Sequence, residues 1–221
     1  MDSFPKIRFL TTWFVHLYWR TKIYGSENIP AAGPFVVVIN HASLLDPYLI
    51  DWASKKRELY FMAKEELFRN PLFGWFLTQC NAFPVKRGVM DEAAIKQFHA
   101  LLAAGKPVGF FPEGTRTLTG ELQPGRKGSG MLVYNAKVPV IPAYIDGTFQ
   151  CFPKGKSWPG PGHTSITFGP VVPLDDLYGE KAEKPTYQKI VDRLMENIAK
   201  LRPKPNNAPI PSCDFSKPLN A

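Results

Sequence analysis

The stretch that decides the fold is residues 35–47, which read FVVVINHASLLDP. Its first five residues are apolar without interruption and mostly β-branched, which favours a strand buried on both faces. Asp46-Pro47 then supplies a helix start, because proline is well tolerated in the first turn of a helix. A fully buried strand followed at once by a helix is typical of α/β proteins with a parallel sheet.

The rest of the chain repeats this alternation of apolar runs and helix-period segments. We therefore predict an α/β domain with a central, largely parallel mixed sheet flanked by helices. The predicted strands are Phe35–Ile39, Leu59–Met62, Ala82–Val85, Val108–Phe111, Val140–Tyr144 and Ser165–Phe168. The predicted helices are Asp46–Ala53, Pro71–Gln79, Asp91–Ala104, Gly130–Ala136 and Thr186–Leu201.

The composition limits both the domain count and the partners. A chain of 221 residues, 44% hydrophobic and 21% charged, suits one globular domain. We place this domain at residues 22–202, between an N-terminal segment 1–21 and a Pro-rich, flexible tail 203–221. The formal net charge of +8 favours an anionic partner, such as a phospholipid headgroup, a phosphate-bearing substrate or nucleic acid. The three cysteines form no C-x-x-C pair, which favours a reducing, cytosolic location over a disulfide framework or a zinc ribbon.

The N-terminal segment contains one apolar stretch, Phe9–Trp19. It is shorter than the roughly 20 residues of a membrane span and lacks a cleavage site, so we predict neither a transmembrane helix nor a signal peptide. As a helix it is amphipathic with basic flanks, which favours peripheral or monotopic attachment to the cytoplasmic face of a membrane. A helix that caps the protein's own core fits the same periodicity. The apolar side comprises Leu10, Trp13, Phe14 and Leu17, the basic flanks are Lys6, Arg8, Arg20 and Lys22, and the expected interface anchors are Trp13, Tyr18 and Trp19.

Several familiar motifs are incomplete in this chain. Gly155-Lys156-Ser157 ends like a phosphate-binding P-loop, but Gln150 stands where the leading glycine is needed. The four histidines form no H-E-x-x-H pair, so we predict no metal site. Basic residues are not interleaved with aromatic residues along any strand, so we predict no nucleic-acid partner.

A histidine and an aspartate follow the buried strand with an H-x4-D spacing, His41 and Asp46. Ligands of open α/β sheets bind at the carboxyl ends of the strands. A histidine there can take a proton from a substrate hydroxyl, while a carboxylate on its other ring nitrogen orients the ring and stabilises the imidazolium. An H-x4-D match arises by chance in roughly one such chain in five, and an aspartate before proline can simply cap a helix. The dyad is therefore a hypothesis that needs support from other motifs.

Three further blocks accompany the dyad. Residues 111–116, FPEGTR, end another apolar run, where Gly114 permits close backbone approach to a ligand and Arg116 carries a planar fork that fits phosphate. Taken alone, this block also fits a surface turn with a solvated arginine. Residues 63–67, AKEEL, precede the basic VKR of residues 85–87, and VPVIP occupies residues 138–142.

The four blocks together resemble the four motifs of the glycerolipid acyltransferases, most closely those of the 1-acylglycerol-3-phosphate (lysophosphatidic acid) acyltransferases. In chain order the blocks are NHASLLD, KEELFRNPLFG to PVKR, FPEGTRT and VPVIPAY. The resemblance spans Gly25–Gly147 and implies the glycerol-3-phosphate acyltransferase-like fold. It makes His41 the catalytic base and Asp46 its orienting partner. It implies acceptor phosphate binding by Lys64, Arg87 and Arg116, with Lys86 and Lys127 as lesser candidates. It implies site-shaping roles for Asn40, Glu113, Gly114 and Thr115, where Glu113 either shapes the site or orders Arg116, and an apolar floor for the acyl chain along the fourth block.

The resemblance further implies transfer of a fatty acyl group from acyl-CoA or acyl carrier protein to the sn-2 hydroxyl of lysophosphatidic acid, giving phosphatidic acid. The expected partners are these substrates and a phospholipid membrane surface, and no cofactor, metal or covalent acyl-enzyme is expected. The same motifs also serve glycerol 3-phosphate and other lysolipids as acceptors. Two other classes stay open: a thioesterase with Ser43 or Cys80 as nucleophile, and a non-catalytic lipid-binding module.

Overall fold

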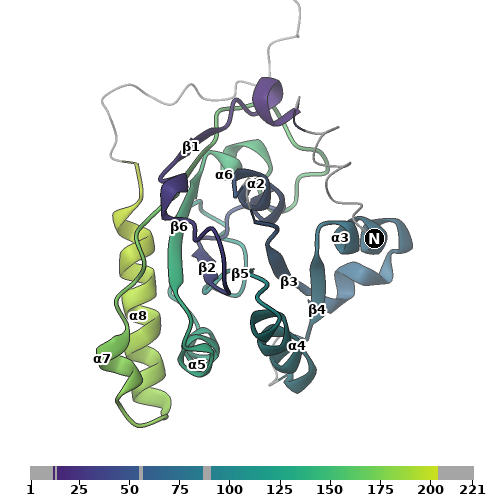
Figure 1. Cartoon of the computed structure of the whole chain (residues 1–221). Coiled ribbons are helices and arrows are strands. Elements are labelled where there is room, and N and C mark those ends of the chain that lie inside the picture. Colours follow the sequence, from purple (N-terminus) through teal and green to yellow (C-terminus); the bar gives the residue numbers. More distant parts are fainter. Residues whose placement is uncertain (1–11, 13, 55–56, 87–90, 204–221) are drawn as a thin grey trace, which may run out of the picture.

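A seven-stranded sheet forms the centre of this computed structural model, which describes residues 12, 14–54, 57–86 and 91–203 (Figure 1). The strand order is β1-β7-β6-β2-β5-β3-β4, and every neighbouring pair is parallel except β6 with β7. The predicted largely parallel mixed sheet is therefore confirmed. The strands are β1 (Lys22–Tyr24), β2 (Val36–Ile39), β3 (Tyr60–Lys64), β4 (Ala82–Val85), β5 (Val108–Phe110), β6 (Val140–Asp146) and β7 (Ser165–Phe168).

Strand β2 lies in the middle of the sheet, between β5 and β6, and all four of its residues are buried. Val36 and Val38 point to one face, where they join a cluster with α4, α5 and α8. Val37 and Ile39 point to the other face and pack with α2. The unbroken apolar run is explained by this burial on both faces.

Helices cover both faces of the sheet. The side chains of α4, α5 and α8 form one cluster, and those of α2 pack with Val15 and Trp19 in the other. The α-helices are α2 (Asp46–Ala53), α3 (Pro71–Gln79), α4 (Glu92–Ala103), α5 (Lys127–Ala136), α6 (Thr148–Cys151), α7 (Asp175–Tyr178) and α8 (Lys184–Lys200). The other helical segments are the π-helical η1 (Phe14–Tyr18) and the 3-10 helices η2 (Ser26–Asn28) and η3 (Glu65–Arg69).

Helices α5 and α8 lie side by side (Figure 1), and glycine permits their close approach. A Cβ on Gly130 would stand 2.0 Å from the carbonyl oxygen of Tyr187, well inside van der Waals contact. Helix α5 also begins three residues earlier than predicted, at Lys127. Its glycine-rich first turn lowers helix propensity, which is why the sequence alone places the start too late.

Strand β1 is a difference between prediction and structure. It is only three residues long, Lys22–Tyr24, with exposed residues at both ends, so it carries no apolar run to predict it. It is an edge strand whose partner, β7, lies more than 140 residues later in the chain. Only this long-range pairing, which local sequence does not show, makes it a strand.

The N-terminal helix prediction is partly wrong where it can be checked. Leu10 and Trp13 lie outside the described residues, and residues 14–18 form the π-helical turn η1. Trp19 is only 7% exposed, and its indole N–H donates to the carbonyl of Gly160 at 3.0 Å. It is thus a residue of the protein's core rather than an interface anchor. In the part of the chain that the structure describes, no helix has the length and apolarity of a membrane span.

Candidate active site

The candidate site lies at the carboxyl ends of β2, β5 and β3, where three predicted motifs meet. The loop after β2 is tied to the loop after β5 by two hydrogen bonds: the amide of Thr117 donates to the carbonyl of His41 at 2.9 Å, and the amide of His41 donates to Glu113 Oε1 at 2.8 Å. Lys64 ends β3 at the same edge. Parallel strands bring these segments together because their carboxyl ends share one edge of the sheet.

His41 and Asp46 are hydrogen bonded to each other. Nδ1 of the imidazole lies 3.0 Å from Oδ2 of Asp46, and both side chains are buried. The same Oδ2 accepts the amides of Ala42 and Ser43, both at 2.7 Å. An ionised carboxylate only accepts, so the pair holds the Nδ1 proton towards Asp46 and leaves Nε2 as the nitrogen that can accept a proton.

The alternative reading of Asp46 as a helix cap does not fit its contacts. Asp46 is the first residue of α2, and the capping position belongs to Leu45. Its Oδ2 accepts from residues 42 and 43, which precede the helix, rather than from amides in the first turn. The carboxylate therefore organises the loop that carries His41.

The His41 ring is fixed from its face as well as from its edge. It stacks on Phe111, with ring centroids 3.9 Å apart and an interplanar angle of 16°. Phe111 in turn lies against Phe61 of β3. A ring held by stacking and by a carboxylate has one orientation for proton transfer, which is the preorganisation that a general base needs.

Asn40 and Glu113 hold the two loops rather than face a ligand. The Asn40 side chain both donates to and accepts from the backbone of Ile145, at 2.9 and 2.7 Å, which anchors the end of β2 to β6. Glu113 accepts from the His41 amide and from both the amide and the side chain of Gln123. Burial raises the pKa of Glu113 to about 7, although these N–H donors oppose the rise. Of the two predicted roles, these contacts fit site shaping, and Glu113 makes no hydrogen bond or ion pair with Arg116 in the described chain.

Gly114 allows a close approach, but to a side chain of the protein. Its φ of +69° is in the left-handed region, and a Cβ there would lie 2.6 Å from Cδ of Arg126. Arg126 Nε donates to the carbonyl of Glu113 at 3.0 Å, which places this arginine against the FPEGTR turn. The residue that approaches Gly114 in this structure is an arginine that the sequence motifs did not single out. Thr115 contributes its carbonyl to Gln123 at 3.4 Å.

The predicted phosphate-binding cations lie in different surroundings. Lys64 lines the cavity described below and pairs with Glu66 at 3.1 Å. Arg116 is half-buried, and burial lowers the pKa of its guanidinium while the nearby Asp46 raises it. Arg87 lies outside the described residues. The lesser candidates Lys86 and Lys127 are exposed, and neither lines the cavity.

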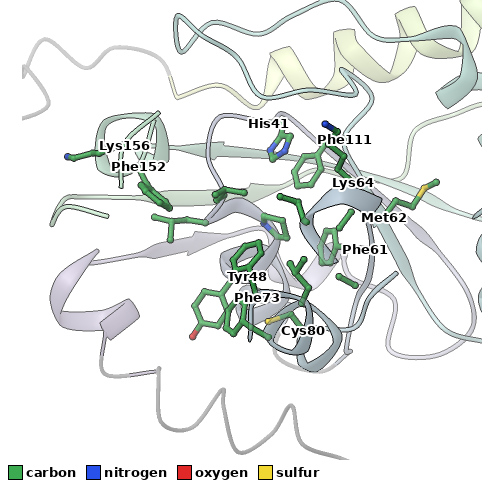
Figure 2. A pocket seen from close by; sticks show the side chains of 18 of the residues that line it. His41, Tyr48, Phe61, Met62, Lys64, Phe73, Cys80, Phe111, Phe152 and Lys156 are labelled. Carbon is green, nitrogen blue, oxygen red and sulfur yellow. The ribbon is translucent and has the colours of Figure 1, made fainter. Parts of the chain in front are cut away.

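A cavity of about 520 Å³ opens beside the His41 ring (Figure 2). It has the size of a small-molecule site and is lined mainly by apolar side chains. Its walls come from α2, β3, α3 and the residues that follow β5 and α6; they include Leu45, Tyr48, Phe61, Phe73, Phe76, Leu77, Cys80, Phe111 and Phe152. The fourth motif, residues 138–144, does not line it, so the predicted apolar floor is wrong: β6 is an interior strand between β2 and β7.

The comparisons with known proteins agree with this geometry. The sequence family described as Acyltransferase matches residues 20–146, which is more than half of the chain. The chain belongs to this acyltransferase family. Its fold also resembles the crystal structure of the 1-acyl-sn-glycerophosphate (LPA) acyltransferase PlsC from Thermotoga maritima, with a TM-score of 0.70, 27% identity, and coverage of 91% of this chain and 81% of that one.

Relatives in sequence point to the same family. A 1-acyl-sn-glycerol-3-phosphate acyltransferase from Bacillus subtilis is 36% identical over 138 residues, which are 61% of this chain and 68% of that protein. A chloroplastic 1-acyl-sn-glycerol-3-phosphate acyltransferase from Brassica napus is 35% identical over 174 residues, 76% of this chain. The chain spans about half the length of this plant relative, 48%.

Ser43 and Cys80, the candidate nucleophiles of the thioesterase hypothesis, are not suited to that role in this acyltransferase. The hydroxyl of Ser43 donates to the carbonyl of Phe152 at 2.9 Å and accepts the amide of Leu45. Burial raises the pKa of the Cys80 thiol to about 12, so it is protonated at neutral pH and a poor nucleophile. Both observations weigh against a thioesterase that works through a covalent acyl-enzyme.

Proposed function

We propose that this protein is a 1-acyl-sn-glycerol-3-phosphate acyltransferase, which moves a fatty acyl group from acyl-CoA or acyl carrier protein to the sn-2 hydroxyl of lysophosphatidic acid. The product is phosphatidic acid, in phospholipid biosynthesis. The observation that carries the proposal is the buried His41–Asp46 pair beside an apolar cavity with a cation at the same edge. The names of the relatives support the choice of acceptor.

In the proposed reaction His41 acts as the general base. Nε2 takes the proton of the acceptor hydroxyl while its oxygen attacks the thioester carbonyl, and Asp46 stabilises the imidazolium that forms. The tetrahedral intermediate collapses, the carbon–sulfur bond breaks, and the leaving thiolate takes up the proton from the imidazolium. The acyl group passes directly between the substrates, so this scheme uses no acyl-enzyme, metal ion or prosthetic group.

The acceptor phosphate is proposed to bind Lys64 and Arg116, together with Arg87. Lys64 stands at the rim of the cavity, and Arg116 follows the turn that Glu113 ties to His41. A phosphate held by these cations would present the neighbouring hydroxyl to Nε2, so positioning would supply much of the rate enhancement. Asn40, Glu113, Gly114 and Thr115 shape the loops, and the cavity would hold an acyl chain.

The substrates are lipids, so we place the enzyme at the cytoplasmic face of a phospholipid membrane as a peripheral or monotopic protein. The basic net charge of +8 supports attraction to anionic headgroups. The amphipathic N-terminal segment is a proposed point of attachment.

One assay tests the proposal against its alternatives. Purified protein is incubated with acyl-CoA and lysophosphatidic acid in detergent, and phosphatidic acid, free fatty acid and released thiol are measured by mass spectrometry. We expect phosphatidic acid formation that falls by about 10²–10⁴-fold in His41→Ala, the range for loss of a general base. His99→Ala, on α4 and outside the site, is the matched control and should keep wild-type activity.

Each alternative predicts a different product pattern in the same assay. Free fatty acid released equally fast without an acceptor would identify a thioesterase. Faster transfer to glycerol 3-phosphate than to lysophosphatidic acid would change the acceptor but keep the reaction class. If no acceptor gives a product and His41→Ala behaves like the wild type, the non-catalytic lipid-binding module is the remaining hypothesis.

A further inference from the structure

Helix α3 presents large apolar side chains to solvent. Leu72 is 81% exposed, Trp75 61% and Phe76 37%. These positions are three and four residues apart, so they share one side of the helix. A contiguous group of exposed large apolar residues is typical of a surface that binds a protein partner, a membrane or a ligand.

The opposite side of the same helix is apolar as well. Phe73, Phe76 and Leu77 line the cavity beside His41 (Figure 2), and Phe76 both lines the cavity and reaches the outer surface. No residue of α3 is charged. The polar side chains of α3 are Thr78, whose hydroxyl donates within the helix to the carbonyl of Gly74 at 2.9 Å, and Gln79 at its last position. An uncharged and mainly apolar helix of this kind is typical of a protein core or a membrane.

Helix α3 is held to the protein by its glycine. A Cβ on Gly74 would stand 2.8 Å from the carbonyl oxygen of Phe68, so the helix packs closely on η3 through a position without a side chain. The Asn70 side chain caps the helix by accepting from the amide of Phe73 at 3.0 Å. These contacts fix α3 as a thin wall whose outward face, Leu72 and Trp75, makes no contribution to the cavity lining.

The surroundings of this outward face suit an anionic lipid surface. The two segments that pack on α3 are η3 and β4; Arg69 of η3 and Lys86, directly after β4, are exposed. The acidic residues of η3 are Glu65, which is half-buried, and Glu66, which pairs with Lys64 at 3.1 Å. Trp75 has the amphipathic ring that favours the level of the headgroups. A water-soluble protein partner would bury Phe76 and separate the cavity from lipid, whereas a bilayer would cover Leu72 and Trp75 and also supply acyl chains.

We propose that the outward face of α3, Leu72 and Trp75, inserts into a phospholipid bilayer, and that acyl chains pass from the bilayer alongside Phe76 into the cavity. The helix lies in the plane of the interface, with its apolar side chains below the headgroups. The docking rests on exposure and composition alone, whereas the passage of acyl chains also rests on the proposed acyltransferase function. The membrane contact is thus part of the folded domain, next to the cavity, in addition to the N-terminal segment.

Vesicle binding tests the docking. Full-length protein is sedimented with vesicles of phosphatidylcholine and phosphatidylglycerol, and wild type is compared with Leu72→Glu and Trp75→Glu. We expect each variant to lower the partition coefficient about tenfold or more, because a carboxylate replaces an inserted apolar group. The matched control is Val171→Glu, because Val171 is also exposed, at 50%, but lies far from the site. The amide of the next residue, Val172, donates to the carbonyl of Val140, the first residue of β6, which is at the opposite end of the sheet from the site. Wild-type binding by Leu72→Glu and Trp75→Glu would overturn the proposal.

Two further measurements separate the possible causes. The first uses short-chain, water-soluble acyl-CoA and lysophosphatidic acid without vesicles. Leu72→Glu should keep wild-type turnover there, because Leu72 lies outside the cavity lining. The second uses a long-chain acceptor in vesicles, where Leu72→Glu should lose activity in proportion to its loss of vesicle binding. No turnover of soluble substrates by wild type would refute the proposed function but leave the sedimentation result decisive for docking. A lipid-free dimer that Leu72→Glu dissociates would show that a second copy covers α3 and would overturn the proposal.

Discussion

The face of the sheet beneath α4, α5 and α8 is filled with side chains, whereas the side that carries α2 and α3 contains a cavity of about 520 Å³. On the filled face, the long helix α8 buries Ile190, Leu194 and Ile198 against the cluster around β2. On the hollow side, α2 buries Leu49 and Ile50 in a second cluster, whereas the only buried residue of α3 is Gly74. Protein interiors contain few voids larger than a water molecule, so the difference indicates that the hollow side keeps space for a ligand beside its own core around α2.

The largest effect should come from the hollow side. Asp46→Asn keeps an oxygen for the amides of Ala42 and Ser43, but it removes the charge that stabilises a His41 imidazolium. We therefore expect turnover in the acyl-transfer assay to fall about 10³-fold, or roughly 4 kcal/mol of barrier, with a nearly unchanged melting temperature. Turnover close to wild type would remove Asp46 from the proposed mechanism, and loss of the folded state would show that its role is mainly structural.

A pair of matched leucines tests the two faces directly. Leu194→Ala, on the filled face, should lower the free energy of unfolding by about 2–5 kcal/mol, because it opens a cavity that the neighbours cannot close. Leu77→Ala removes the same atoms from a wall that already borders a cavity, so it should cost about 1 kcal/mol or less. Urea denaturation of both variants measures the difference. Equal losses would mean that the cavity collapses or that α3 carries more of the stability than its burial indicates.

The filled face and the centre of the sheet could largely be predicted from the sequence. The run FVVVI predicts β2 because burial on both faces demands uninterrupted apolar residues. The helix over residues 186–201 is predicted because its apolar residues recur at helical spacing, and α8 ends within one residue of that range. The H-x4-D spacing correctly places the His41 and Asp46 side chains together, since the six residues between β2 and α2 can only form a short loop.

The hollow side could not be predicted in the same way. Its lining combines residues as far apart in the sequence as Trp19 and Phe152, and no local pattern brings them together. The same periodicity fits a membrane interface and the protein's own core, which is why Trp19 was expected at an interface and lies buried. Helix α3 was predicted with the correct bounds, but which of its sides faces outward depends on the packing of Gly74 against η3.

The smallest effect concerns Glu113, whose loop borders the hollow side. Burial raises its pKa to about 7, above the ordinary value of 4.5, so the folded state binds this proton more tightly than the unfolded state does. The contribution of Glu113 to stability is therefore full below about pH 4.5 and is lost as the pH rises through 7, a loss on the order of 2 kcal/mol. Glu113→Gln should remove that part of the pH dependence, measured as the unfolding free energy at pH 5 and pH 8.

The matched control for this prediction is Glu196→Gln on α8. Glu196 is exposed and pairs with Lys200 at 2.8 Å, and this lysine lowers the pKa of the Glu196 carboxyl. The contribution of Glu196 to stability therefore has the opposite pH dependence to that of Glu113. It is also small, because solvent screens the pair. Glu196→Gln should therefore show the same fall in unfolding free energy between pH 5 and pH 8 as the wild type. If Glu113→Gln keeps it as well, the three N–H donors around the Glu113 carboxylate outweigh its burial and hold it ionised at neutral pH. The loop that carries the His41 amide would then be anchored by a full charge, and the hollow side would depend on ionic as well as apolar contacts for its shape.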